Sequence, residues 1–371
     1  MTSFKNRNCD VLIVGGGPAG LTLANCLALT PLRFIVVEME SPGRRPSRAT
    51  GLQPRLLELL KHLGIKDELV KQATTLFGNK VFVDGNLTTT VSFYDPHSRS
   101  YALSLDQGVI EGMLVAALQK KGASVEWGKR LLNLQKQHGR WIADIEIGGS
   151  ALEHITADVV VACDGGKSTV RGLAGIDFPG ETYHETAFIC DCRVDCDLPP
   201  RYVHFFFSKE YRLVLVPYSE TRYKVSGGMR MQPTTEGHRL ITEMANALYP
   251  GKLVFEDIAD FRFYRMHARI AEVFCRENIF LCGDAAHLFP PNGGQGLNVA
   301  IEDAFFLGQL IEKCDMTKRW ENLKVYGSRK TQIEEKLYQV KMTKSRYSYE
   351  SLTKTPIDKE QETKRVIDEE L

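Results

Sequence analysis

The sequence has no apolar run close to the roughly 20 residues that a membrane-spanning helix needs. Residues 1–9 are polar rather than cationic and apolar, so we expect neither a transmembrane segment nor a secretory leader. The sequence also has no excess of one charge, because 47 Lys and Arg residues are balanced by 46 Asp and Glu residues, which gives a formal net charge of +1. A nucleic-acid surface would need a basic excess. We therefore expect a cytoplasmic protein with no nucleic-acid partner.

Cysteine is too sparse and too irregular for a disulfide framework, because the nine cysteines are an odd number and are scattered through expected strands and helices. Cys190, Cys192 and Cys196 form the one cluster, in which the first two share a face of an expected strand. No second pair of metal-ligand residues follows them. We therefore expect reduced, buried cysteines and no metal site.

What the sequence does have is a glycine-rich turn directly after its first apolar strand. Gly15 allows the tight turn, Gly17 lets the backbone approach a pyrophosphate, and Gly20 lets the following helix pack closely on the sheet. This helix opens at Pro18 and Ala19 and points unpaired N–H groups at the phosphates. The turn therefore predicts a dinucleotide-binding site.

Glu38 ends the next apolar strand, residues 34–37, where its carboxylate would accept hydrogen bonds from both ribose hydroxyls of an adenosine. Its charge would repel a 2′-phosphate, so the ligand is FAD or NAD rather than NADP. With 371 residues, the chain has room for a nucleotide-binding domain and a second domain.

Two acidic motifs follow later apolar strands: Asp164-Gly165 comes after residues 157–163, and Gly283-Asp284 after residues 279–282. The carboxyl ends of parallel strands are where open α/β sheets bind ligands. Either motif alone is most simply a turn. Both motifs in this order after the glycine turn favour FAD over NAD.

A second glycine-rich segment, residues 290–298, precedes an apolar helix that we expect over residues 296–311. Its glycines let the backbone approach an aromatic plane, and the helix would aim its positive end at that plane. A flexible turn before a helix is the alternative. The cofactor contacts that these glycines predict include Gly294 and Gly296.

Over about residues 10–330, these motifs make the sequence similar to the FAD-dependent aromatic hydroxylases, the group A flavoprotein monooxygenases that include para-hydroxybenzoate hydroxylase. The resemblance implies that Arg48 reaches the flavin phosphates and that Gln107, at the start of a helix, contacts the cofactor. It also implies that Asp164 and Gly165 contact both FAD and a passing nicotinamide cofactor. Asp284 would bind the ribityl chain, and the loop that ends at Leu297 and Asn298 would run beside the flavin ring, so these two residues are also implied as cofactor contacts.

The resemblance and the order of the expected elements predict an α/β fold with three parts. They are a Rossmann-like FAD-binding domain of the GR2 type, an inserted and mostly antiparallel β-sheet domain for the substrate, and a C-terminal helical segment. The FAD-binding domain takes residues 1–75, 101–182 and 270–315, the substrate domain residues 76–100 and 183–269, and the helical segment residues 316–371.

The sequence holds one strand-linked glycine turn and no second one, so NADPH or NADH would act as a transient reductant. The family resemblance implies a monooxygenase that hydroxylates a phenolic or heteroaromatic small molecule with O2 through a flavin C4a-hydroperoxide. Two alternatives stay open. One is a flavin-dependent reductase or dehydrogenase of the same fold, such as a polyprenyl reductase, and the other is a non-catalytic flavoprotein. We expect a monomer or a homodimer.

Substrate residues would come largely from the second domain. Tyr202 and His204 share one face of an expected strand, and Arg212 lies on the next strand. In one interpretation this face is a pocket wall, with His204 or Tyr202 as proton relay and Arg212 as anion clamp. Cross-strand aromatic pairs with a solvated arginine are the other interpretation. Pro291, in the glycine-rich segment, completes the predicted catalytic set.

His287 follows the Gly283-Asp284 motif and lies close to the glycine-rich segment. A catalytic base is one possibility for such a histidine. We favour the other, in which the His287 ring is hydrogen-bonded to backbone and has a structural role.

Overall fold

The chain folds around two large sheets, and the structure, a computed structural model, describes residues 5–43, 50–95, 97, 100–229, 237–291, 294–313, 321–346 and 352. The first sheet contains β1 (Lys5–Val14), β2 (Phe34–Glu38), β9 (Val125–Trp127), β10 (Lys129–Gln137), β11 (Arg140–Ile147), β12 (Ala151–Ala162), β18 (Cys275–Arg276) and β19 (Ile279–Leu281). Parallel pairing places β12 between β1 and β19, and β2 on the other side of β1. The central strands are apolar and buried on both faces, as a parallel sheet between helices requires.

Helices pack on this first sheet. They are α1 (Pro18–Leu27), α2 (Leu56–His62), α3 (Lys66–Gln72), α4 (Gln107–Lys120), α5 (Thr169–Leu173) and α7 (Gln295–Glu312), with a short 3₁₀ turn η1 (Gly283–Ala285). α1 packs against both α4 and α7. At the contact with α7, a Cβ on Gly308 would stand 2.6 Å from the Cβ of Cys26, so glycine permits this close approach.

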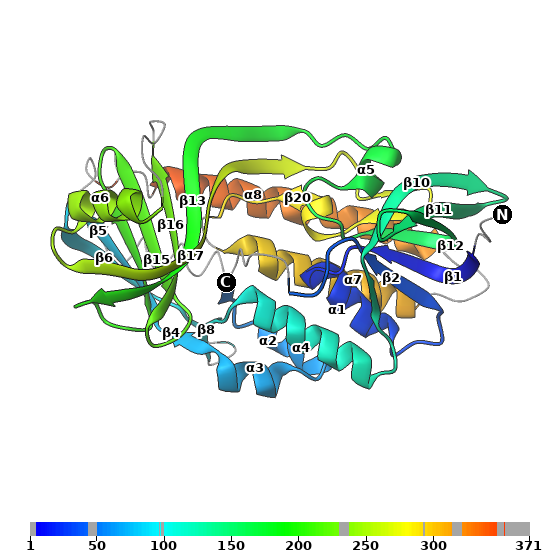
Figure 1. The fold of residues 1–371 in the computed structure, drawn as a ribbon, viewed down its shortest axis with the longest axis horizontal. Coiled ribbons are helices and arrows are strands. Elements are labelled where there is room, and N and C mark those ends of the chain that lie inside the picture. Colours follow the sequence, from blue (N-terminus) through cyan, green and yellow to red (C-terminus); the bar gives the residue numbers. More distant parts are fainter. Residues whose placement is uncertain are drawn as a thin grey trace.

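The second sheet has the strand order β20-β17-β13-β16-β15-β14-β5-β6. Its strands are β5 (Gly78–Val83), β6 (Asn86–Ser92), β13 (Gly180–Cys196), β14 (Tyr202–Phe207), β15 (Tyr211–Pro217), β16 (Arg222–Met229), β17 (Leu253–Ile270) and β20 (His287–Leu288). Every pair is antiparallel except β14 with β5. The long strands β13 and β17 run from this sheet toward the first one (Figure 1).

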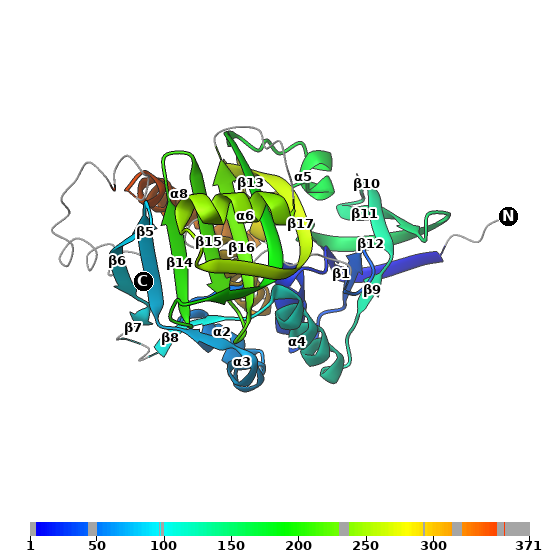
Figure 2. The ribbon, with the colours of Figure 1, turned by 60° about the vertical axis from the view of Figure 1, so that its left-hand side comes forward.

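Helix α6 (His238–Leu248) covers one face of the second sheet and lies on the side away from the first sheet (Figure 1, Figure 2). Its apolar residues pack with Leu213, Leu215 and Phe188, which alternate along their strands. The intervening residues of β15 are only half-buried and face the opposite way. One face of the sheet is therefore sealed by α6, and the other is turned toward the first sheet and its helices.

A small third sheet joins β3 (Gly51–Leu52), β4 (Thr74–Leu76), β7 (Tyr94–Asp95) and β8 (Ser100–Ser104). At the far end of the chain, η2 (Glu321–Ser328) and α8 (Arg329–Arg346) pack on α7 and β17, respectively. None of the helices in the described ranges is both long enough and apolar enough to cross a membrane. The side chains of Cys190 and Cys192 are buried against α6, as predicted.

Candidate functional site

Three of the predicted motifs meet at one edge of the first sheet. The glycine turn ends β1, Asp164-Gly165 follows β12, and Gly283-Asp284 follows β19. Because β12 pairs in parallel with both β1 and β19, the carboxyl ends of all three strands point to the same edge. Segments far apart in the sequence therefore form one candidate site.

Gly15 and Gly20 are required by the backbone geometry of the turn. Gly15 has a φ of +112°, and a Cβ there would stand 2.2 Å from the carbonyl oxygen of Cys163. A Cβ on Gly20 would stand 1.9 Å from the carbonyl oxygen of Gly15. The turn and the start of α1 thus lie in backbone contact with each other and with the end of β12. Pro18 and Ala19 are the first two residues of α1, as predicted.

Glu38 is fixed beside this turn. Its carboxylate accepts hydrogen bonds from the backbone N–H groups of Gly16, at 2.6 Å, and Glu40, at 2.9 Å, and the residue is 2% exposed. Each oxygen of a carboxylate can accept more than one hydrogen bond. The position of Glu38 at the end of β2 therefore fits recognition of a ribose.

Asp164 has a buried oxygen that fits an external donor. Its Oδ2 accepts a hydrogen bond from the N–H of Val170 at 3.1 Å, whereas its buried Oδ1 receives none from the described residues. Burial raises the pKa of this carboxyl, although hydrogen bonds, first among them that from Ser168, act to lower it. A buried polar atom of this kind is normally satisfied by a ligand or water. A hydroxyl of an extended cofactor would fit here.

Gly283 brings together the third motif and two helices, because a Cβ there would stand 3.0 Å from the Cβ of Ala300 and 3.2 Å from that of Ala19. Asp284 is half-buried in η1. Gln107 is the first residue of α4, and its side chain donates a hydrogen bond to Glu111 at 2.8 Å. Arg48 lies outside the described residues.

The start of α7 is held by Asn298, which is 1% exposed. Its side-chain nitrogen donates to the carbonyl oxygens of Gly51, at 3.0 Å, and Gly294, at 2.8 Å, and its oxygen accepts from the N–H of Gln53 at 2.8 Å. Asn298 therefore ties the first turn of α7 to β3. Gly294 precedes the helix in the left-handed conformation, and Gly296 and Leu297 lie in its first turn.

Among the described residues the His287 ring has no backbone hydrogen-bond partner, so the partner predicted for it is wrong. Its Nε2 lies 2.5 Å from Oδ2 of Asp303 on α7, and Oδ1 of Asp303 accepts a hydrogen bond from Nε of Arg329 on α8 at 2.8 Å. His287 and Asp303 are both almost fully buried. The Asp303 carboxylate holds the His287 ring as a backbone carbonyl would. Through Arg329, the same carboxylate also links the C-terminal helix α8 to α7. Sequence reasoning missed Asp303, since one acidic residue in an apolar helix gives no distinctive signal.

Of the two interpretations of this face, the one that places His204 and Arg212 on a single pocket wall is wrong. His204 pairs with Leu215, and Arg212 with Phe207, so the two side chains lie on opposite faces of the sheet. His204 faces α6 and is 2% exposed, and burial lowers its pKa to about 4. Arg212 is on the opposite face, with NH2 3.8 Å from Oε2 of Glu185. The catalytic roles suggested for these residues stay predictions.

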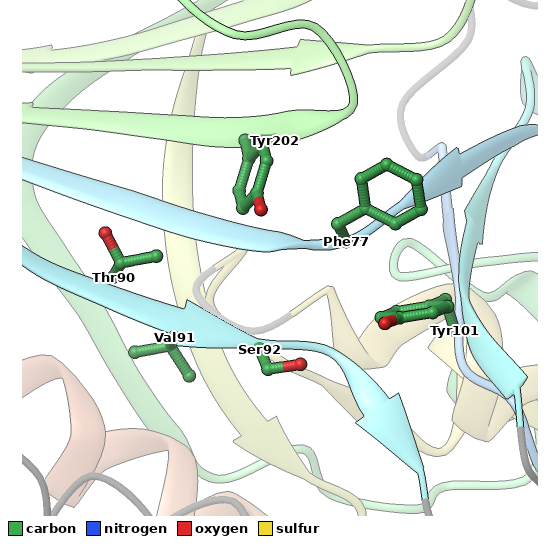
Figure 3. Close-up of a pocket in the computed structure, with 6 residues that line it drawn as sticks. All are labelled: Phe77, Thr90, Val91, Ser92, Tyr101 and Tyr202. Atoms are coloured by element: carbon green, nitrogen blue, oxygen red, sulfur yellow. The ribbon is translucent and has the colours of Figure 1, made fainter.

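Tyr202 shares the face of His204, two residues earlier on β14, and lines an aromatic cavity of about 420 Å³ at the β5–β6 end of the sheet (Figure 3). The cavity is lined by Phe77, Thr90, Val91, Ser92, Tyr101 and Tyr202. Pro291 is exposed at the end of a described range, before the residues that lead into α7.

The sequence matches the model of the FAD-binding domain family over residues 8–341. This chain belongs to that FAD-binding family. The predicted α/β fold and FAD cofactor are therefore confirmed.

Curated relatives of this family member are monooxygenases. Rifampicin monooxygenase of Streptomyces venezuelae is 31% identical, over 81% of this chain and 63% of the relative. Pentachlorophenol 4-monooxygenase of Sphingobium chlorophenolicum is 27% identical, over 90% of this chain and 64% of the relative. The chain thus spans less than two thirds of the length of these relatives.

Solved structures share the fold. The p-nitrophenol 4-monooxygenase of Pseudomonas putida DLL-E4 has a TM-score of 0.82 at 23% identity, over 99% of this chain and 94% of the other. The complex of aklavinone-11 hydroxylase with FAD and aklavinone has a TM-score of 0.79 at 25% identity, over 95% of this chain and 71% of the other. Both likenesses extend across the second sheet.

Proposed function

We propose that this chain is an FAD-dependent monooxygenase that takes electrons from NADPH or NADH and hydroxylates a phenolic or heteroaromatic small molecule with O2. The observation that carries the proposal is the placement of the second sheet. Its face opposite α6 is turned toward the domain that holds FAD and keeps half-buried apolar side chains, among them Val214 and Val216. The names of the relatives, which oxidise rifampicin or pentachlorophenol, support the same reaction class.

The residues that would hold FAD follow from their places along the sheet edge. The glycine turn and Glu38 would take the adenosine end. Asp164, Gly165 and Asp284 would contact the middle of the cofactor, and Arg48 and Gln107 would complete its contacts. Bound in this way, FAD supplies the redox chemistry that activates O2.

The protein's own part in the reaction is binding, orientation and exclusion of water. The N-terminus of α7, after Gly294, presents unpaired backbone N–H groups and the positive end of an 18-residue helix. Negative charge is stabilised at such a helix end. The two sheets would hold the aromatic ring between them and keep water out, which favours oxygen transfer to the substrate over release of hydrogen peroxide.

The domain boundaries predicted from the sequence belong to this proposal. The second sheet takes most of its strands from the two segments assigned to the substrate domain, and β20 joins it from the segment assigned to FAD binding. A monomer or homodimer in the cytoplasm stays part of the proposal.

The test is substrate-stimulated oxidation of NADPH or NADH by the FAD-loaded protein, with a panel of phenols and heteroaromatics under ¹⁸O2. Incorporation of one labelled oxygen into a product is the expected result. Product formation in the absence of O2 would show a reductase or dehydrogenase instead. Asp284→Ala should lower the bound FAD per chain, while Glu58→Gln, a change in an exposed ion pair with Lys66, should leave it unchanged.

A further inference from the structure

The face of the second sheet turned toward the FAD domain carries an ordered row of side chains. Val216 on β15 pairs with Lys224 on β16, and Lys224 pairs with Asp191 on β13, so these three residues lie side by side on this face. The next row along the strands holds Val214, Ser226 and Ile189 in the same way. The first row is thus mainly charged, and the second is mainly apolar.

Lys224 and Asp191 form a buried ion pair in the first row. Lys224 Nζ lies 2.6 Å from Oδ2 of Asp191, and the two residues are 4% and 8% exposed. Lys224 Nζ is also 3.7 Å from Oδ2 of Asp106, the residue that caps α4 just before Gln107. The pair thus lies where the second sheet meets the FAD-binding domain.

The charges at this place do not favour an anionic ligand. Two carboxylates, of Asp191 and Asp106, face the ammonium group of Lys224, and the Arg222 guanidinium also acts on Asp191, so the four charges sum to zero. Removing both ions from water costs solvation free energy. The remaining polar atoms of a buried ion pair are therefore normally hydrogen-bonded. Oδ1 of Asp191 is buried and receives no hydrogen bond from the described residues. This oxygen needs a donor.

Tyr218 is the neighbouring phenol. Its hydroxyl oxygen accepts a hydrogen bond from Nε of Arg222 at 3.3 Å, and burial above all raises its pKa to about 12. The Asp191 carboxylate adds to this shift through its charge and through a hydrogen bond with the Tyr218 hydroxyl. Tyr218 therefore stays protonated at neutral pH and takes no proton from a substrate.

We propose that Oδ1 of Asp191 accepts a hydrogen bond from a hydroxyl group of the aromatic substrate, while Lys224 fixes the Asp191 carboxylate in position. The ring would lie against the apolar side chains of Val214 and Ile189 in the next row. The inference rests on the proposed function and narrows its substrate class to neutral aromatic molecules with a free hydroxyl. An aromatic carboxylate would be disfavoured, because it has no proton to donate to Oδ1 of Asp191.

Three probes of one shape test this inference on the oxidised FAD-loaded protein: 2-naphthol, 2-methoxynaphthalene and 2-naphthoate. Their dissociation constants come from changes in flavin absorbance. Since a hydrogen bond to a charged acceptor is among the stronger ones, wild type should bind 2-naphthol about 10- to 100-fold more tightly than its methyl ether. It should bind 2-naphthoate more weakly than 2-naphthol.

Asp191→Asn gives a directional test. The ammonium of Lys224 is only a donor, so the amide introduced by this substitution would turn its oxygen toward Lys224 and its NH2 group toward the substrate. A donor would then replace an acceptor, and the preference for 2-naphthol over the ether should fall to about 3-fold or less. Arg193→Gln is the matched control on the same strand, because Arg193 is half-exposed in its ion pair with Glu256. It should keep the wild-type preference.

Equal affinity of wild type for 2-naphthol and the ether would overturn the inference, as would tighter binding of 2-naphthoate or no binding of 2-naphthol up to its solubility limit. These binding measurements on wild type require neither catalytic turnover nor a folded variant. If wild type shows the expected preference but hydroxylates nothing with NADPH or NADH, the proposed function fails and the assignment of Asp191 as a hydroxyl acceptor stands.

Discussion

At the scale of single residues, the face of a strand decides what a side chain can do. His204 faces α6, and burial, with a smaller contribution from the charge of Lys80, lowers its pKa from 6.5 to about 4. The folded chain therefore keeps this ring neutral at a pH where the unfolded chain protonates it. Its contribution to stability is present above about pH 6.5 and is lost as the pH falls toward 4.

His204→Phe should reduce the loss of unfolding free energy that occurs as the pH falls. A shift from 6.5 to about 4 corresponds to about 3 kcal/mol of unfolding free energy lost between these pH values. Between pH 7.5 and pH 4.5, the unfolding free energy measured in urea should therefore fall by about 2–3 kcal/mol less in the variant than in wild type. His184→Gln, at an exposed position on β13, is the control. Equal losses in all three proteins, with turnover abolished by His204→Phe, would support the catalytic role instead.

At the scale of elements, a buried ion network joins β20, α7 and α8. Burial alone would raise the pKa of Asp303, but the charges of His287 and Arg329 outweigh it and lower that pKa. Next to Asp303, Glu302 pairs with Arg329 at 3.1 Å and with Lys336 at 2.9 Å. The C-terminal helix α8 is thus coupled to α7, the helix whose first turn we propose to face the flavin.

Arg329→Leu should destabilise the fold by roughly 3–5 kcal/mol, because removal of one partner leaves the fully buried Asp303 carboxylate undercompensated. The measurement is urea unfolding at pH 7.5. Arg239→Leu removes an exposed ion pair with Glu243 on α6 and should cost no more than about 0.5 kcal/mol. A cost for Arg329→Leu no larger than that of this control would show that the network contributes little to the stability of α7.

At the scale of the whole molecule, the meeting of the strand ends in the first sheet could be predicted from the sequence, whereas the contacts across the second sheet could not. Gly15, Asp164 and Gly283 each follow an apolar strand, and the rule for parallel sheets collects such strand ends at one edge. Asp191 and Lys224 gave no such signal. Their contact depends on the register of β13 with β16, and β13 changes register with β17 on both sides of Asp191. The face taken by His204 likewise depends on where α6 packs, which no local pattern encodes.

Assembly of the FAD site from distant strands makes cofactor binding a property of the folded chain only. FAD at about 100 times its dissociation constant should therefore raise the unfolding free energy by about 2.7 kcal/mol. Glu38→Ala would leave ribose hydroxyls without their acceptor and weaken FAD binding by roughly 1–3 kcal/mol, so it should lose about 1 kcal/mol or more of that increment. Urea unfolding with and without FAD measures both. Glu58→Gln should keep the full increment, and an equal increment in Glu38→Ala would remove Glu38 from the site.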